Sequence, residues 1–188
     1  MVDEALRTRL QEMVDRADIH DCMMRYARGI DRHDRELLRS AYHDGAIDEH
    51  VGFVGLVDDF IDCAFAYHST QTRHQHYLPN HTADIDGDVA HAETYYIFVG
   101  IDRDPENHLT INGGRYVDRL ERRDGRWGIT ARVCMVEWQT ESTTSITTEV
   151  IELLAGIQTT ARDRTDTSYI RPLVITRAPG HDPRNSPS

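Results

Sequence analysis

The sequence lacks the features that mark membrane and secreted proteins. No apolar run approaches the roughly 18–20 residues that a membrane-spanning helix needs, and the N-terminal segment MVDEALRTRLQEM has no apolar signal core. The three cysteines, Cys22, Cys63 and Cys134, are far apart and form no CxxC pair, which is typical of reduced thiols. We therefore expect a cytoplasmic protein that neither crosses nor binds a membrane.

Basic residues are scarce as well. The 188 residues include 21 Lys and Arg against 32 Asp and Glu, a net charge of −11 with neutral histidines. Such a surface repels phosphate backbones, which argues against nucleic acid as the main partner. There is no Gly-rich phosphate loop, GxSxG elbow or HExxH motif, so familiar nucleotide sites are not supported. The 39% hydrophobic content suffices for the core of one ordinary domain.

The N-terminal part has the periodicity of helices. One apolar stripe runs along Leu6, Leu10, Met13 and Ala17, and a second, out of phase with it, along Ile19, Met23, Tyr26 and Ile30. This slip predicts two helices or one bent helix, ending near Gly29. Further helices are predicted over residues 34–42 and 57–67.

From residue 72 onward, the sequence has turn signals that are typical of an antiparallel sheet. Asp86-Gly87 and Asp124-Gly125 are hairpin signals, predicting that strand 74–84 pairs with 90–101 and 114–122 with 126–140. Asn112-Gly113-Gly114 predicts a bulge that bends the sheet. The fold class is therefore α+β, a curved antiparallel sheet with helices packed against it, over residues 1–145. Residues 146–188 are predicted as an extension, with a helix at 147–157 and disorder from 178.

The histidines invite comparison with metal sites. His74 and His76 are two residues apart, so on a strand their side chains share a face. The other candidate ligands, His81, His91 and Glu93, have no recognisable metal-site spacing. We therefore expect no bound metal.

Arg132 is the most informative residue that the pattern offers. It shares its predicted strand face with Cys134, Val136 and Trp138, which is the composition of a buried face. An arginine there needs a partner or a cavity to point into. Tyr26 lies on the apolar stripe of its helix and fits a core tyrosine as well as a site residue.

Three segments together resemble one family. They are IHDCMMRYARGIDRHD at 19–34, RHQHYLPNHTADIDGDVAHAETY at 73–95 and DGRWGITARVCMVEW at 124–138. Their order and separation are similar to those in the SnoaL-like branch of the nuclear-transport-factor-2-like superfamily, which includes dehydratases and a dehydrochlorinase. The resemblance covers residues 10–140 and implies a cone-shaped α+β barrel that works without metal or organic cofactor.

The resemblance also implies roles for individual residues. Asp31 and His76 match the catalytic Asp–His pair, Tyr26 a catalytic tyrosine, and Arg132 a strand arginine that stabilises developing negative charge. If the alignment is shifted by two residues, His74 is the base instead. The cone interior would bind substrate through side chains that include His74, Tyr95, Phe98, Met135 and Trp138.

Three functions fit this set of residues. The first is a cofactor-independent lyase, which eliminates water or a similar group, or performs a retro-aldol cleavage, on a small apolar ring-containing molecule, for example in the catabolism of aromatic compounds. The second is an isomerase or cyclase with the same acid–base pair, and the third is a non-catalytic binding subunit, like the small subunits of ring-hydroxylating dioxygenases. The open sheet predicts a homo-oligomer. The resemblance implies a trimer in preference to a dimer, and we expect residues 147–157 to contribute to the interface.

Overall fold

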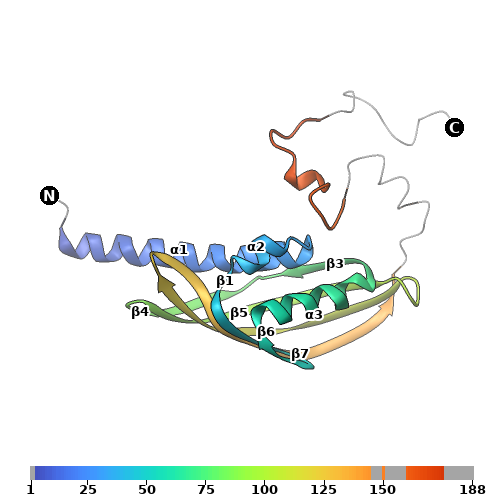
Figure 1. The fold of residues 1–188 in the computed structure, drawn as a ribbon, viewed down its shortest axis with the longest axis horizontal. Coiled ribbons are helices and arrows are strands. Elements are labelled where there is room, and N and C mark those ends of the chain that lie inside the picture. Colours follow the sequence, from blue (N-terminus) through green and yellow to red (C-terminus); the bar gives the residue numbers. More distant parts are fainter. Residues whose placement is uncertain (1–2, 145–149, 151–159, 176–188) are drawn as a thin grey trace.

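The elements follow the predicted order of helices and then strands except that two strands lie between the second and third helices (Figure 1). The computed structural model describes residues 3–144, 150 and 160–175. The helices are α1 (Glu4–Asp31), α2 (Arg35–Arg39), α3 (Val57–Ser69) and the short 3-10 helix η1 (Thr167–Tyr169). The strands are β1 (Tyr42–His50), β2 (Phe53–Leu56), β3 (Gln71–Tyr77), β4 (His81–Asp86), β5 (Val89–Asp102), β6 (His108–Arg123) and β7 (Arg126–Thr143).

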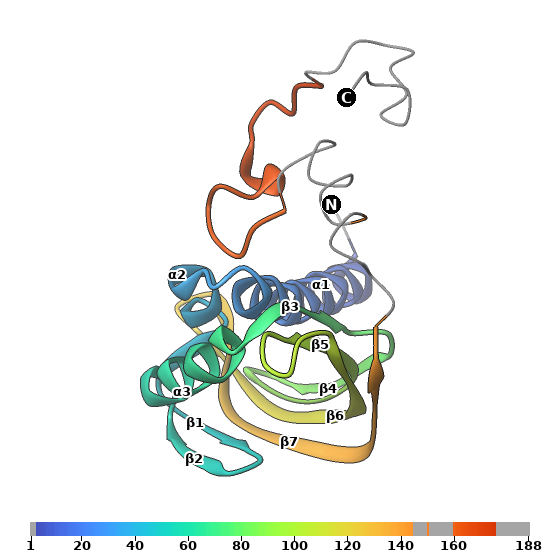
Figure 2. The same ribbon diagram turned by 90° about the vertical axis from the view of Figure 1, so that its right-hand side faces the viewer.

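The strands form one curved, unclosed seven-stranded sheet in the order β2-β1-β7-β6-β5-β3, with β4 also paired to β5. All pairings are antiparallel except that of β1 with β7. Figure 2 shows the sheet curling beneath α1, with α3 beside β1. The predicted α+β class and both hairpins are confirmed, since Gly87 and Gly125 take positive φ values in their turns.

Helix α1 is continuous, which decides between the two predicted alternatives. It does not end at Gly29 but runs to Asp31. Gly29 instead allows α1 and α2 to pack closely. A Cβ at this position would lie 2.5 Å from the backbone nitrogen of Leu38 in α2, which is too close for any other residue. The helix ends where His33 adopts a positive φ of 48°.

The two apolar stripes of α1 have different environments. Ile19, Met23 and Tyr26 of the second stripe are fully buried against the sheet, whereas Leu6 and Met13 of the first are exposed. Figure 1 shows why: the N-terminal end of α1 projects past the sheet. The phase slip therefore marks the point at which the helix leaves the core.

Two predicted elements need correction. The predicted helix at 34–42 is shorter, because the chain turns into β1 at Tyr42, and β1 and β2 were not predicted. The predicted strand 74–84 is interrupted at Leu78-Pro79-Asn80, and its halves, β3 and β4, pair with successive parts of β5. Pro79 has no N–H to give to the ladder, which explains the interruption.

The predicted bulge is present where the register of β6 and β7 shifts between Gly113 and Gly114. A Cβ on Gly114 would lie 1.8 Å from the carbonyl oxygen of Met135, so only glycine fits. The extra residue in β7, Glu137, reverses the alternation of side chains beyond it. Trp138 therefore lies on the outer face, 47% exposed, and not on the face of Arg132 as predicted.

Within the described residues, no helix is both long and apolar enough to cross a membrane. The predicted helix at 147–157 lies outside the described residues except for Val150, and the segment predicted to be disordered, 178–188, lies wholly outside them.

Candidate functional site

A cavity of about 510 Å³ lies between the helices and the inner face of the sheet. Its wall is mostly apolar and aromatic and includes Tyr26, Phe60, His68, His76, Phe98 and Tyr116. The polar groups on this wall are few, which is typical of a site for a small apolar molecule.

His76 and Asp31 meet at the wall of this cavity. Asp31 is the last residue of α1, and His76 lies near the end of β3. Nδ1 of His76 lies 2.7 Å from Oδ1 of Asp31, and the backbone N–H of His76 donates to Oδ2 at 3.0 Å. The two residues that the resemblance matches to an Asp–His pair are therefore hydrogen-bonded to each other.

This contact orients the His76 ring. A carboxylate only accepts hydrogen bonds, so Nδ1 carries the proton that is donated to Asp31. When the ring is neutral, Nε2 therefore holds the lone pair, and no hydrogen bond joins Nε2 to any residue in the described part of the chain. The ring is thus oriented as a base towards the cavity.

His74 lies outside this cavity, contrary to the predicted substrate contact. Its side chain is buried, with Nε2 3.1 Å from the carbonyl oxygen of Ile30 and 3.8 Å from Asp31. Its ring lines a separate, smaller cavity of about 260 Å³ beside Arg162. Although His74 and His76 point to the same face of β3, only His76 reaches the larger cavity.

Two stacked, buried histidines support this wall: His68, which lines the cavity, and His74, which lies outside it. The ring of His68 in α3 stacks on His74 at 4.1 Å between centroids and is held by Gln71, whose Oε1 lies 3.0 Å from Nδ1. Burial lowers the pKa of His68 from 6.5 to about 2 and that of His74 to about 4. Both rings are therefore neutral at physiological pH.

These two histidines predict an acid-sensitive fold. Below pH 6.5 the unfolded chain protonates both rings while the folded chain does not, so stability must fall as the pH drops towards 4 and below. Urea unfolding at a series of pH values should show this decline, and His74→Gln should make it shallower by about 1.4 kcal/mol per pH unit, the effect of one proton. An unchanged slope would contradict the assignment.

Arg132 is buried as predicted, but it does not face the cavity. Its side chain is 1% exposed, and Nε and Nη2 each donate to the carboxylate of Asp118 at 2.7 Å. The rings of Tyr26 and Tyr116, which do line the cavity, lie 4.0 and 4.2 Å from its guanidinium carbon. The predicted direct catalytic contact is therefore corrected: Arg132 supports the two tyrosines.

Three predicted substrate contacts lie on the wrong face of the sheet. Tyr95, Met135 and Trp138 are exposed on its outer side and do not line the cavity, whereas Phe98 does, 5.0 Å from the ring of His76. Tyr95 and Phe98 are three residues apart on one strand and so must point to opposite faces. The same alternation places Met135 opposite Cys134, a lining residue.

The sequence analysis missed a second histidine–aspartate pair. His50, at the end of β1, lines the cavity, and its Nδ1 is hydrogen-bonded to Asp48. The hydroxyl of Tyr42 donates to the other oxygen of Asp48 at 2.6 Å, and Nε2 of His50 lies 3.4 Å from the hydroxyl of Tyr26. Asp48 and His50 are two residues apart, like His74 and His76, so on a strand their side chains share a face. This signal is informative only if residues 42–50 form a strand, which the sequence analysis does not predict.

The two members of this pair stabilise each other's charge. Burial is the largest single influence and lowers the pKa of His50, but the hydrogen bonds with Asp48 and Cys134 and the Asp48 charge together outweigh it and raise the pKa to about 9. Burial raises the pKa of the neighbouring Tyr26 hydroxyl, which is therefore neutral. The cavity thus has a charged imidazole and a neutral hydroxyl side by side.

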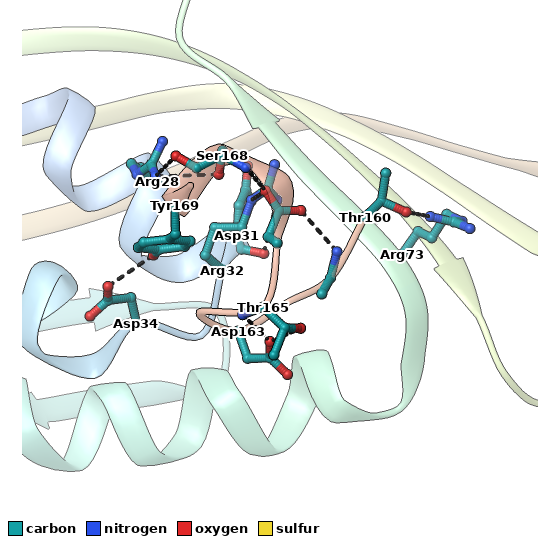
Figure 3. Close-up of polar contacts among 12 residues, drawn as sticks. Arg28, Asp31, Arg32, Asp34, Arg73, Thr160, Asp163, Thr165, Ser168 and Tyr169 are labelled. Atoms are coloured by element: carbon teal, nitrogen blue, oxygen red, sulfur yellow. Dashed lines mark hydrogen bonds and ion pairs between the residues drawn. The ribbon is translucent and has the colours of Figure 1, made fainter. Parts of the chain in front are cut away.

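The C-terminal segment 160–175 packs where α1 ends, next to Asp31 (Figure 3). The hydroxyl of Tyr169 donates to Asp34 at 2.9 Å, and the guanidinium of Arg28 lies 4.7 Å above the Tyr169 ring. Asp166 lies 3.6 Å from Nε of Arg32. The extension therefore braces the helix end that holds the Asp31 carboxylate.

Across the described residues, no group of three or more His, Cys, Asp or Glu side chains could hold a metal ion.

The chain is similar to known proteins in sequence and in fold. The model of the SnoaL-like domain family matches residues 11–133. A search among curated proteins finds no significant match. Hexachlorocyclohexane dehydrochlorinase LinA-type3 from Novosphingobium barchaimii superposes with a TM-score of 0.66 at 20% identity, over 73% of this chain and 95% of that one.

Two further solved structures have similar scores. A putative scytalone dehydratase from Novosphingobium aromaticivorans gives a TM-score of 0.63 at 16% identity, over 72% of this chain and 93% of its own. The Kfla4162 protein from Kribbella flavida gives 0.63 at 18% identity, over 69% and 95%. These likenesses show the fold, and the sequence match to residues 11–133 identifies the chain as a member of the SnoaL-like domain family.

Proposed function

We propose that the protein is a cofactor-independent lyase that eliminates water, or a similar small group, from an apolar ring-containing molecule. The observation that carries this proposal is the hydrogen-bonded pair of His76 and Asp31 at the wall of an aromatic cavity. The family match and the likeness to a dehydrochlorinase and a putative dehydratase support the same class.

The pair is suited to removing a proton from carbon. Nε2 of His76 takes the proton next to a carbonyl or similar activating group, and the ring becomes an imidazolium. Asp31 stabilises that cation through Nδ1–H and keeps the ring in its reactive orientation. The electrons left on the substrate then expel the leaving group and form a carbon–carbon double bond.

The remaining wall suits the rest of such a substrate. The neutral hydroxyl of Tyr26 donates a hydrogen bond to substrate oxygen, and Phe98 and Tyr116 offer ring faces for apolar contact. Arg132 lies behind Tyr26 and Tyr116, so its positive charge acts on the cavity through these rings.

The test is a set of ring-bearing β-hydroxy ketones incubated with the purified protein and followed by mass spectrometry. Loss of water with formation of the conjugated enone is the expected result. A product of unchanged mass would favour the isomerase or cyclase, which shares the first proton transfer. Tight binding without any product would favour the binding subunit.

We also propose that the chain forms a homo-oligomer, a trimer in preference to a dimer. Exposed apolar side chains support an oligomer: they form the first stripe of α1, and on the outer sheet face Tyr95, Met135 and Trp138 lie around the ion-paired Arg115. Exposed apolar patches of this kind mark protein–protein contacts.

Met135→Glu should weaken that assembly, because it puts a charge into the centre of the outer apolar face. Sedimentation velocity should show the native protein at three times the chain mass and the variant shifted towards the monomer. Gln75→Glu, an exposed polar position on β3, is the matched control and should leave the assembly intact. A monomeric native protein at micromolar concentration would refute the proposal.

A further inference from the structure

His50 and Asp48 form a second pair that the proposed reaction does not use. It lies on β1, whereas His76 and Asp31 come from β3 and the end of α1, yet both histidines line the same cavity. We propose that His50, held by Asp48, is the acid of the site, which gives a proton to the oxygen that leaves the substrate. This inference rests on the proposed function and deepens it, because it assigns the substrate an oxygen leaving group.

The first support is the environment of Asp48. Its carboxylate is fully buried, and its two oxygens contact His50 Nδ1 and the Tyr42 hydroxyl, respectively. A buried carboxylate is costly unless a positive charge or several donors compensate it. A protonated His50 supplies that charge through Nδ1–H, so the pair is most stable as imidazolium and carboxylate.

The second support is the position of the other nitrogen. The His50 side chain is 21% exposed and lines the cavity, and its ring stacks on Phe60 at 4.5 Å. Nε2 lies 3.4 Å from the hydroxyl of Tyr26. An N–H at this position donates to the Tyr26 oxygen, and the Tyr26 hydrogen is then free to point at a substrate oxygen.

The groups that surround His50 favour the charged ring. On β1 it meets Asp48, on α1 the Tyr26 hydroxyl, and on β7 the Cys134 thiol. Tyr116 of β6 and Phe60 of α3 contribute ring faces. The hydrogen bonds with Asp48 and Cys134, together with the Asp48 charge, outweigh burial and raise the pKa of His50 to about 9, so the imidazolium persists at neutral pH.

The two pairs divide the proton transfers. His76 removes the proton from carbon, the carbon–oxygen bond breaks, and the electron pair of the broken C–H bond forms the double bond. The departing oxygen takes the Tyr26 hydroxyl proton, which His50 Nε2–H replaces, and leaves as water. His76 then returns its proton to solvent, and His50 regains one from solvent, so no other reactant is needed.

This arrangement selects a class of substrate. Hydroxide is a poor leaving group and departs readily only when it is protonated, whereas chloride departs as the anion. A site that contains a charged acid opposite its base is therefore built for the elimination of water from a β-hydroxy carbonyl compound, rather than for the loss of halide.

The test uses para-nitrophenol, whose phenolate and phenol forms absorb at different wavelengths, so that it reports the donor independently of turnover. At about pH 6 the wild-type protein should bind it as the phenolate, because His50 and Tyr26 stabilise the oxyanion. His50→Gln should weaken phenolate binding by about tenfold or more, the equivalent of one pKa unit. His76→Gln, the matched variant of the other pair, should retain the phenolate band.

Two measurements separate a lost donor from a damaged fold. Para-nitroanisole, which cannot ionise, should bind the wild type and His50→Gln equally. Nitrogen NMR of the wild type should show the His50 ring as imidazolium at about pH 7. A neutral ring, or a phenolate band that His76→Gln removes and His50→Gln keeps, would overturn the proposal. Failure of the wild type to dehydrate any β-hydroxy ketone would instead overturn the proposed function.

Discussion

Replacing His76 with alanine is expected to abolish turnover of a β-hydroxy ketone and to leave the fold intact. The ring contributes the base and lies at the wall of a cavity, so its loss removes the proton acceptor and little packing. Asp31→Asn keeps the shape but loses the charge that stabilises the imidazolium, and should cost about 10²–10⁴-fold in rate. Initial rates with thermal melts alongside measure both effects.

His74→Gln is the control for this prediction. His74 lies on the same face of β3 but contacts the carbonyl of Ile30 and not the larger cavity. Its replacement should leave most of the rate and alter chiefly the acid stability. If His74→Gln abolishes activity and His76→Ala does not, the base has been misassigned by two residues along the strand.

Removing Arg132 is expected to have the largest effect on stability. Arg132→Met leaves the fully buried carboxylate of Asp118 without its bidentate partner, and an uncompensated buried charge of this kind costs about 3–5 kcal/mol. Tyr26 and Tyr116 also lose the cation that packs against their rings. Urea unfolding should show the loss as a lower midpoint.

Two control variants test whether the loss of stability in Arg132→Met comes from the unpaired, buried Asp118 carboxylate. Arg119→Met removes an arginine of β6 that is half-exposed and pairs with Glu121, and should cost at most about 1 kcal/mol. The double variant with Arg132→Met and Asp118→Leu removes both buried charges and should recover much of the lost stability. If Arg132→Met were as mild as Arg119→Met, the buried pair would not support the cavity wall.

The sequence predicts features that depend on neighbouring residues better than contacts between residues far apart in the chain. The hairpins, the bulge and the buried stripe of α1 follow from turn residues and periodicity within short segments. The contact between Asp31 and His76 joins a helix end to a strand 45 residues later, so only the family resemblance pointed to it. His50 was missed because β1 was not predicted: it pairs on one side with β7, far along the chain, and on the other with β2, in a local hairpin at Val51-Gly52 that the sequence analysis did not use.

Two register shifts explain the positions of Arg132 and Trp138. Counting back from the Asp124-Gly125 turn pairs Arg132 with Val117, but a shift between Arg119 and Leu120 moves it opposite Asp118. The buried arginine thus finds its partner on the neighbouring strand and not in a cavity. The second shift, at Gly113 and Gly114, turns Trp138 outward. Bulges displace pairings by one residue, and hydrophobic alternation alone does not reveal where they act.

In the proposed reaction, His76 takes a proton from a carbon atom of a molecule bound in the cavity. Hydrogen–deuterium exchange tests it most directly, with a ring-bearing ketone that has no leaving group, incubated with the protein in heavy water and followed by mass spectrometry. The account predicts enzyme-catalysed incorporation of deuterium next to the carbonyl, lost in His76→Ala and retained in His74→Gln. Exchange that proceeds equally in the wild type and in His76→Ala, or no exchange above the rate in buffer, would contradict it.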